Sequence, residues 1–235
     1  MRKVIVNFSG GVDSTASALK ALKQYPKDEI LLCYQDTQAD YLETADHVKQ
    51  IAGMLDLPLL VLKDGLGFWG RVRQYGRFPL PGTRVCTRQL KADVTEKWIR
   101  SYHEELGNEV IQIYGFRAQE SQGRANMETF VSNDRLTLKR GDFKAYYYLP
   151  IHDMNKVQVK EYVEANGLPI HPCYEFSERC SCWCCIFQPP HVVREYAEMQ
   201  PKLYEQACLV EDEIRNKWKY RFGFNDLMKQ GRLFI

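Results

Sequence analysis

A strand that leads directly into a glycine-rich turn and a helix is the feature that most constrains this chain. Residues 3–8 form a short apolar run, the turn Ser9–Ser14 reads SGGVDS, and a helical pattern continues to Gln24. Such a helix directs its first N–H groups and the positive end of its dipole at one point. Glycines let a ligand approach the backbone closely. The segment predicts an anion site, with an ordinary β–α turn as the alternative.

The alternation of strands and helices continues along the chain. Strands are predicted at 29–35, 57–62, 110–114 and 145–151, and helices at 37–55, 87–105 and 155–166. This order favours an α/β fold with a doubly wound, mostly parallel sheet and helices on both faces. Residues 63–83 break the pattern and predict a long functional loop, within which Gly65–Gly70 is expected to form a mobile lid. Helical patterns return over 190–220, with a fresh start at Pro201.

Two units follow from this organisation. We expect a nucleotide-binding α/β domain over residues 1–170, and a cysteine cluster with C-terminal helices packed on it over 171–235. The length of 235 residues, 45% of them hydrophobic, suits one or two domains.

Charge and hydropathy restrict the setting of the protein. The net charge of +2 neither requires nor excludes a polyanionic partner. No apolar run approaches the roughly 20 residues that cross a bilayer, and the N-terminus has too few apolar residues for a signal peptide. We therefore expect a cytoplasmic protein with no membrane partner and with reduced thiols.

Cysteines are concentrated in one segment. Five of the eight lie within thirteen residues, namely Cys173, Cys180, Cys182, Cys184 and Cys185. Crowding of this kind in a reducing compartment indicates metal binding or thiol chemistry.

Several motifs in a fixed order resemble the PP-loop ATP-pyrophosphatase (adenine nucleotide α-hydrolase) superfamily, and within it the phosphoadenylyl-sulfate (PAPS) reductase family. The turn SGGVDS is similar to the PP-loop. The further matches are Asp36-Thr37 with Glu43-Thr44, VCTRQLK at 85–91, GFRAQES at 115–121 with Arg124, PIHD at 150–153 and GLPIHPCY at 167–174. The resemblance spans roughly residues 4–190.

The resemblance implies an adenine nucleotide, either ATP with Mg²⁺ or PAPS or APS, over the carboxyl ends of the strands. The implied nucleotide-binding residues are Ser9, Gly10, Gly11, Asp13, Ser14, Asp36, Thr37 and Gly115. The implied substrate-binding residues are Arg88, Lys91, Arg117 and Arg124, because cationic side chains, and above all guanidinium groups, suit phosphate or sulfate oxygens. The implied catalytic residues are Asp13, Arg117 and Glu120, with Glu120 expected to orient Arg117. Each arginine taken alone has a solvated surface charge as its alternative.

A metal centre is also implied. Its expected ligands are Cys86, Cys173, Cys182 and Cys185, with Cys180 and Cys184 as substitutes. Four thiolates suit a [4Fe–4S] cluster, with structural zinc as the alternative. The spacing from Cys173 to Cys185 is similar to that in the ATPase subunit of DNA phosphorothioation systems, although a further cysteine shortly after Cys185 is missing.

One residue that the reductases carry is missing from this sequence. They carry a nucleophilic cysteine in a Glu-Cys-Gly-x-His type motif near the C-terminus, whereas no cysteine follows Cys208 in this sequence. We therefore expect an adenylating enzyme that cleaves ATP between the α and β phosphates and supports sulfur transfer.

The partners and alternatives follow from the same reasoning. The basic 71–88 region favours a nucleic-acid substrate, and we expect a sulfur donor such as a cysteine desulfurase and a homo-oligomeric state. One alternative is a sulfonucleotide reductase that uses another thiol, such as Cys184. The other is a non-catalytic nucleotide-sensing subunit with structural zinc.

Overall fold

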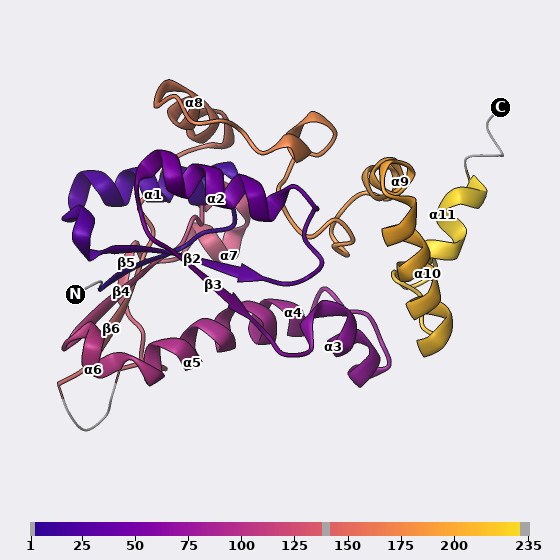
Figure 1. Ribbon diagram of the computed structural model, residues 1–235, viewed down its shortest axis with the longest axis horizontal. Coiled ribbons are helices and arrows are strands. Elements are labelled where there is room, and N and C mark those ends of the chain that lie inside the picture. The colour runs from indigo at the N-terminus through magenta and orange to yellow at the C-terminus, as the bar shows by residue number, and fades with distance from the viewer. Residues whose placement is uncertain (1–2, 138–141, 231–235) are drawn as a thin grey trace.

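A mixed six-stranded sheet lies at the centre of the computed structural model, which describes residues 3–137 and 142–230 (Figure 1). Its strands are β1 (Val4–Asn7), β2 (Ile30–Asp36), β3 (Leu59–Lys63), β4 (Glu109–Ile113), β5 (Phe130–Ser132) and β6 (Lys144–Tyr148). Their order is β3-β2-β1-β4-β6-β5, and every neighbouring pair is parallel except β5 with β6. The predicted mostly parallel α/β sheet is confirmed.

The central strands are buried on both sides. Every side chain of β1 except Asn7 is buried, as are six of the seven in β2. A parallel sheet covered on both faces requires such continuous apolar runs. Because β2 and β3 extend the sheet on one side of β1, and β4 and β6 on the other, the strand order reverses between β1 and β4. A crevice at the carboxyl ends of the strands is expected at that point.

Helices cover both faces of the sheet (Figure 1). Helices α1 (Val12–Gln24), α2 (Thr44–Leu55) and α8 (Lys156–Ala165) lie on one face, and α5 (Asp93–Ser101) and α6 (His103–Leu106) on the other. The start of α8 shows why its bounds could be predicted. The Asn155 side chain accepts a hydrogen bond from the Gln158 N–H, and Gly167 follows the helix with φ +73°.

The helix predicted over 87–105 is divided. It consists of α4 (Val85–Thr87), a π-helical turn η2 (Arg88–Ala92), α5 and α6. Gly107, with φ +85°, ends it as expected.

Four elements differ from the prediction. The helix expected over 37–55 begins only at Thr44. Residues 67–75 form helix α3 (Gly67–Tyr75), so the expectation of an irregular loop is wrong there. Only Phe68 and Val72, one turn apart, are its buried large side chains, which is too short a pattern to recognise among Gly and Arg residues. The exposed edge strand β5 and the last helix, α11 (Phe224–Gln230), also had no clear pattern.

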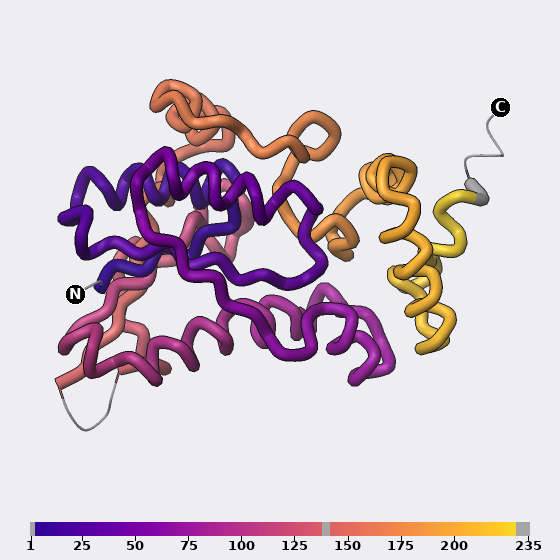
Figure 2. The backbone as a smooth tube through the Cα atoms, in the orientation of Figure 1, coloured from indigo at the N-terminus to yellow at the C-terminus, as the bar shows by residue number. Residues whose placement is uncertain are grey.

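The C-terminal helices α9 (Pro190–Met199), α10 (Pro201–Ile214) and α11 lie together at one end of the sheet (Figure 2). Their apolar core includes Trp183, Trp218 and Phe224, and it also contains Phe68 of α3. Because this core takes side chains from both sides of residue 170, the domain boundary proposed there stays a prediction. The shorter elements are η1 (Lys27–Glu29), η3 (Ala118–Glu120), α7 (Gln122–Ala125) and η4 (Pro172–Glu175).

The described residues include no helix with the length and apolarity needed to cross a membrane.

Candidate functional site

The predicted phosphate loop joins the end of β1 to the start of α1. Gly10 has φ +77°, and a Cβ there would lie 3.0 Å from Val48 Cγ2 and 3.2 Å from His47 Cδ2, so glycine is required. Ser14 Oγ donates to the Gly11 carbonyl at 2.9 Å and accepts from the Ser9 N–H at 3.2 Å. Ser9 and Ser14 therefore shape the loop from within.

The loop after β4 packs against the phosphate loop. A Cβ on Gly115 would lie 2.8 Å from both the carbonyl carbon and the oxygen of Asp13. This close approach brings the buried Arg117 to Asp13, where Arg117 Nε donates to Asp13 Oδ1 at 2.6 Å. Burial raises the pKa of Asp13, and the Arg117 guanidinium opposes that rise only in part. Two of the three predicted catalytic residues thus meet where the strand order reverses.

Glu120 has a different partner from the one expected. Its carboxylate pairs with the Arg124 guanidinium and accepts from the Arg117 backbone N–H at 2.9 Å. The guanidinium of Arg117 is oriented by Asp13 and by Gln119, whose Oε1 accepts from Nη1 at 3.3 Å. The expectation that Glu120 orients the Arg117 side chain is therefore wrong, and Glu120 positions Arg124 instead.

The other two predicted substrate-binding residues lie apart from these arginines. The Arg88 side chain is 69% exposed, with its Nε 3.6 Å from Asp93 Oδ1. Lys91 instead lies among cysteines: burial lowers its pKa, but Cys182 and Asp40 lead the charges that outweigh it, so the pKa is raised. Lys91 is therefore a cation of the thiol region.

The segment after β2 links the sheet to the cysteines. Asp36 Oδ2 lies 2.8 Å from Lys63 Nζ, and its Oδ1 accepts from the Gln38 N–H. The buried Thr37 donates through Oγ1 to Asp40 Oδ2 at 3.0 Å, and the same Oγ1 lies 3.4 Å from Cys182 Sγ. The predicted nucleotide residue Thr37 thus also touches the cysteine cluster.

The segment His171–Cys185, here called the cysteine segment, packs on the phosphate loop. The Tyr174 hydroxyl accepts from the Val12 N–H, the first of α1, at 3.3 Å. A Cβ on Gly11 would lie 3.1 Å from Cys180 Cβ. Residues more than 160 positions apart in the sequence therefore meet, and Figure 2 shows this segment crossing the end of the sheet between α8 and α9.

Three possible metal ligands are close together in this segment. Within the part of the chain that is described, His171, Cys173 and Cys180 form the one group of three or more His, Cys, Asp or Glu side chains whose ligand atoms lie within 4.8 Å of one another. Only Cys173 of the four predicted ligands belongs to it. A hydrogen bond with Cys180 lowers the pKa of Cys173 to about 6, against the effect of burial, and the pKa of Cys180 is raised.

The remaining cysteines of the cluster have other environments. Cys182 Sγ lies 3.6 Å from Asp40 Oδ1. The pKa of Cys86 is raised mainly by burial and to a smaller extent by the nearby Cys185. Cys184 is completely buried, burial raises its pKa, and its carbonyl accepts from Trp218 Nε1. Cys184 is therefore unsuited to the role of a substitute nucleophile.

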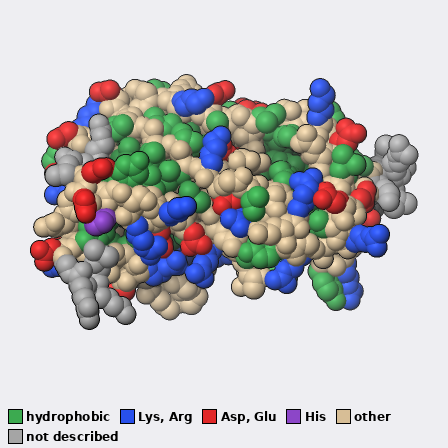
Figure 3. All heavy atoms as spheres, turned by 60° about the horizontal axis from the view of Figure 1, so that its bottom comes forward, with side chains coloured by type: hydrophobic (Ala, Val, Ile, Leu, Met, Phe, Trp, Pro, Cys, Tyr) green, Lys and Arg blue, Asp and Glu red, His purple; other side chains and the backbone are tan. Residues whose placement is uncertain are grey.

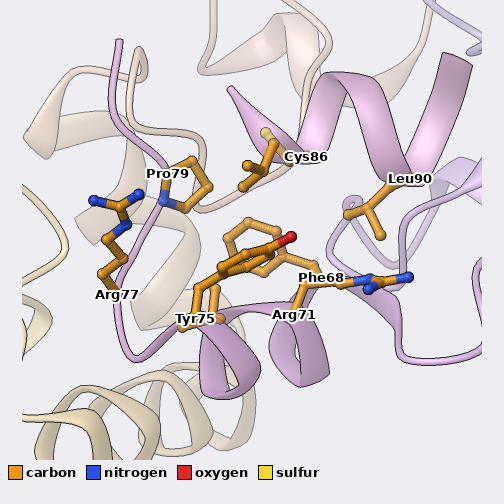
Figure 4. A pocket seen from close by; sticks show the side chains of 9 residues that line it. Phe68, Arg71, Tyr75, Arg77, Pro79, Cys86 and Leu90 are labelled. Atoms are coloured by element: carbon orange, nitrogen blue, oxygen red, sulfur yellow. The ribbon is translucent and has the colours of Figure 1, made fainter. Parts of the chain in front are cut away.

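A small cavity lies beside Cys86 (Figure 4). Its lining side chains come from α3, the segment after it, α4 and η2: Phe68, Arg71, Val72, Tyr75, Arg77, Pro79, Val85, Cys86 and Leu90. Asp64 holds Arg71 through two hydrogen bonds of 2.7 and 3.0 Å. The cavity thus places aromatic rings and arginines next to a thiol.

Sequence reasoning did not single out Asp40, Thr44 or Tyr174 as contacts of the site. Tyr174 and Thr44 lie within the quoted motifs, which was the available signal. Asp40 carried none.

Comparison with known proteins shows which proteins this chain is similar to. The profile of the phosphoadenosine phosphosulfate reductase domain matches residues 3–187. An uncharacterized protein of Methanocaldococcus jannaschii is 27% identical over 87% of this chain and 40% of its own length. A phosphoadenosine 5'-phosphosulfate reductase of Vibrio campbellii is 26% identical over 72% and 61%, and a tRNA-specific 2-thiouridylase of Pseudoalteromonas atlantica is 28% identical over 72% and 47%.

A solved structure shares the fold. The phosphoadenylyl-sulfate reductase of Candida auris, in a phosphate complex, aligns with a TM-score of 0.51 at 17% identity, over 79% of this chain and 83% of that one. The chain spans 40 to 61% of the length of the three curated relatives named above. With the matched domain covering most of its residues, the chain belongs to the phosphoadenosine phosphosulfate reductase domain family within the PP-loop adenine nucleotide α-hydrolase superfamily.

Proposed function

We propose that the chain is an adenylating enzyme that cleaves ATP between the α and β phosphates and supports sulfur transfer. The observation that carries the proposal is the meeting of the phosphate loop with the Asp13–Arg117 pair at the carboxyl end of β1. The backbone N–H groups, the helix N-terminus and the guanidinium group there suit the anionic phosphates of a nucleoside triphosphate.

Each group around the phosphate loop has its own proposed role in binding and cleaving ATP. The amides of the loop and of α1 hold phosphate oxygens, and Arg117 and Arg124 stabilise the charge that develops on the leaving pyrophosphate. Mg²⁺, when bound, neutralises phosphate charge. The Asp13 carboxylate next to the loop is the oxygen ligand that fits it. Asp36 and Thr37, at the end of β2, are proposed to contact the nucleoside.

The thiols of the cysteine segment support the sulfur-transfer part of the proposal. Their soft donor atoms suit a [4Fe–4S] cluster or zinc. Cys86, Cys182 and Cys180 all raise the pKa of Lys91, so they share one neighbourhood. A four-thiolate centre would take Cys86, Cys173, Cys182 and Cys185 as its ligands and would supply sulfur or redox chemistry there; it competes for Cys173 with a site formed by His171, Cys173 and Cys180.

A nucleic acid is the proposed substrate. Arg77 and Arg84 lie on the segment before α4, where the Arg84 guanidinium stands 5.7 Å from the centre of the Phe187 ring. Figure 3 shows Lys and Arg side chains on the face in view, interspersed with acidic side chains. Basic side chains beside exposed aromatic rings favour a single strand whose bases can stack. Binding should weaken steeply with salt.

The test is product analysis. The protein is incubated with Mg²⁺, α-labelled ATP, a persulfide donor, a dithiol reductant and a pool of tRNA, and AMP and pyrophosphate are measured. We expect AMP and pyrophosphate in equal amounts, together with thiolated nucleoside in the RNA. Nucleotide binding without pyrophosphate release would contradict adenylation and favour a sensing subunit.

Sulfonucleotide reduction is the second candidate. It is favoured by the relative in Vibrio campbellii and by a thiol, Cys173, placed next to His171 beside the phosphate loop. Release of sulfite from PAPS or APS with a dithiol reductant would support it, and AMP formation from ATP would oppose it.

A further inference from the structure

Two thiols and one imidazole converge beside the phosphate loop. The ligand atoms of His171, Cys173 and Cys180 lie within 4.8 Å of one another. Bonds of about 2.3 Å to sulfur and about 2.0 Å to nitrogen place the ligand atoms of a tetrahedral zinc ion about 3.5 to 4 Å apart. Small rotations of these side chains would therefore let all three bind one ion.

The imidazole is already held in a tautomer that suits a ligand. The Cys173 backbone N–H donates to Nδ1 at 3.0 Å, so that nitrogen carries the lone pair. Nε2 then carries the proton and donates to Thr44 Oγ1 at 3.1 Å. Metal-binding histidines are commonly fixed by a hydrogen bond on the other ring nitrogen. An ion at Nδ1 would replace only the hydrogen bond from the Cys173 N–H.

The three side chains differ in their exposure to solvent. His171 and Cys173 are each 1% exposed, whereas Cys180 is partly exposed and packs on Gly11 of the phosphate loop. Tyr174, next to Cys173, contacts the first N–H of α1.

We propose that His171, Cys173 and Cys180 bind one zinc-class divalent cation beside the phosphate loop. Thiolate and imidazole donors suit zinc and not Mg²⁺, and three protein ligands with one open position are typical of catalytic zinc. This assigns Cys173 to a mononuclear site and leaves Cys86, Cys182 and Cys185 outside it. The inference rests on the proposed function for the nature of the neighbouring nucleotide, and it takes the place of the four-thiolate centre considered there.

The test is cobalt titration of the metal-free protein without nucleotide. We expect one Co²⁺ per chain, with the visible absorption of a tetrahedral thiolate site, and displacement by Zn²⁺. Cys173→Ser and Cys180→Ser should each weaken binding at least tenfold. The matched variants Cys86→Ser, Cys185→Ser and Cys208→Ser should bind as the wild type does. Unchanged binding by the first pair, or loss in Cys86→Ser or Cys185→Ser, overturns the site.

X-ray absorption of the zinc-loaded wild type supplies a second readout that does not depend on how the variants fold. Two sulfur ligands, with nitrogen or oxygen completing the shell, are expected. A shell of four sulfurs, or four irons per chain, would overturn the inference in favour of the four-thiolate set. Normal zinc binding without ATP cleavage would contradict only the proposed function, and ATP cleavage without zinc binding would contradict only this site.

Discussion

The phosphate loop and the cysteine segment lie against each other, but they are built differently. The loop takes its shape from consecutive residues: Gly10 at φ +77°, the Ser14 hydroxyl on the Gly11 carbonyl, and the start of α1. The cysteine segment is held by contacts with distant parts of the chain, such as Tyr174 with Val12 and Cys182 with Asp40. A local backbone device can be recognised in sequence, whereas a site assembled from distant contacts cannot.

The largest effect on stability should come from filling the space between the phosphate loop and the loop after β4, at the carboxyl ends of the strands. Gly115→Val would push a branched side chain into the Asp13 backbone, from which a Cβ alone would lie 2.8 Å. We expect a loss of about 1–3 kcal/mol in the free energy of unfolding, as overpacking typically costs. Urea denaturation measures it.

Gly53→Ala in α2 is the matched control. A Cβ there meets nothing within 4 Å. It should stabilise the protein by about 0.5–1 kcal/mol. Equal stability of the two variants would show that the loops are not closely packed.

The next effect concerns the charge at the loop. Arg117→Lys keeps the charge but loses the Nε bond to Asp13, so the rate of ATP cleavage should fall by about 10²–10³. Arg100→Lys, with a side chain 55% exposed on α5, is the control and should leave the rate unchanged. Similar rates for both variants would remove Arg117 from the site.

The thiols of the sheet and of the cysteine segment should differ in their rates of alkylation. Cys33, in β2, is 0% exposed, and burial raises its pKa to about 11. At pH 8 only about one in a thousand of its thiols is ionised, against roughly a quarter for an ordinary thiol. Iodoacetamide should modify the partly exposed Cys185 of the metal-free protein faster than the completely buried Cys33, as measured by peptide mass spectrometry. Comparable rates would mean that the sheet opens.

The smallest effect tests the link between the two regions. Tyr174→Phe removes the acceptor of the Val12 N–H. We expect a loss of about 0.5–1.5 kcal/mol in unfolding free energy, measured by thermal denaturation. Tyr220→Phe, at a residue 88% exposed, should change nothing. No difference between the two would mean that the hydroxyl contributes nothing to docking of the cysteine segment.

Prediction from sequence was most successful where a pattern is local. The strands, the loop and the ends of α8 follow from apolar runs, glycines and a cap. Helix α3 has too few buried side chains to show a period, and β5 is exposed. The pairing of Glu120 with Arg124 depends on the side-chain conformations of both residues in the folded protein, which the sequence does not show. The grouping of Cys173 with His171 and Cys180 depends on the path of an irregular segment.

The most direct test of the central claim is calorimetric titration of ATP with Mg²⁺ into the wild type and into Gly10→Ala. The account predicts one nucleotide per chain for the wild type. It predicts at least tenfold weaker binding for the variant, because a Cβ is strained at φ +77° and meets Val48 at 3.0 Å. Absence of binding to the wild type, or equal binding by both proteins, would contradict the assignment of this loop as the nucleotide site.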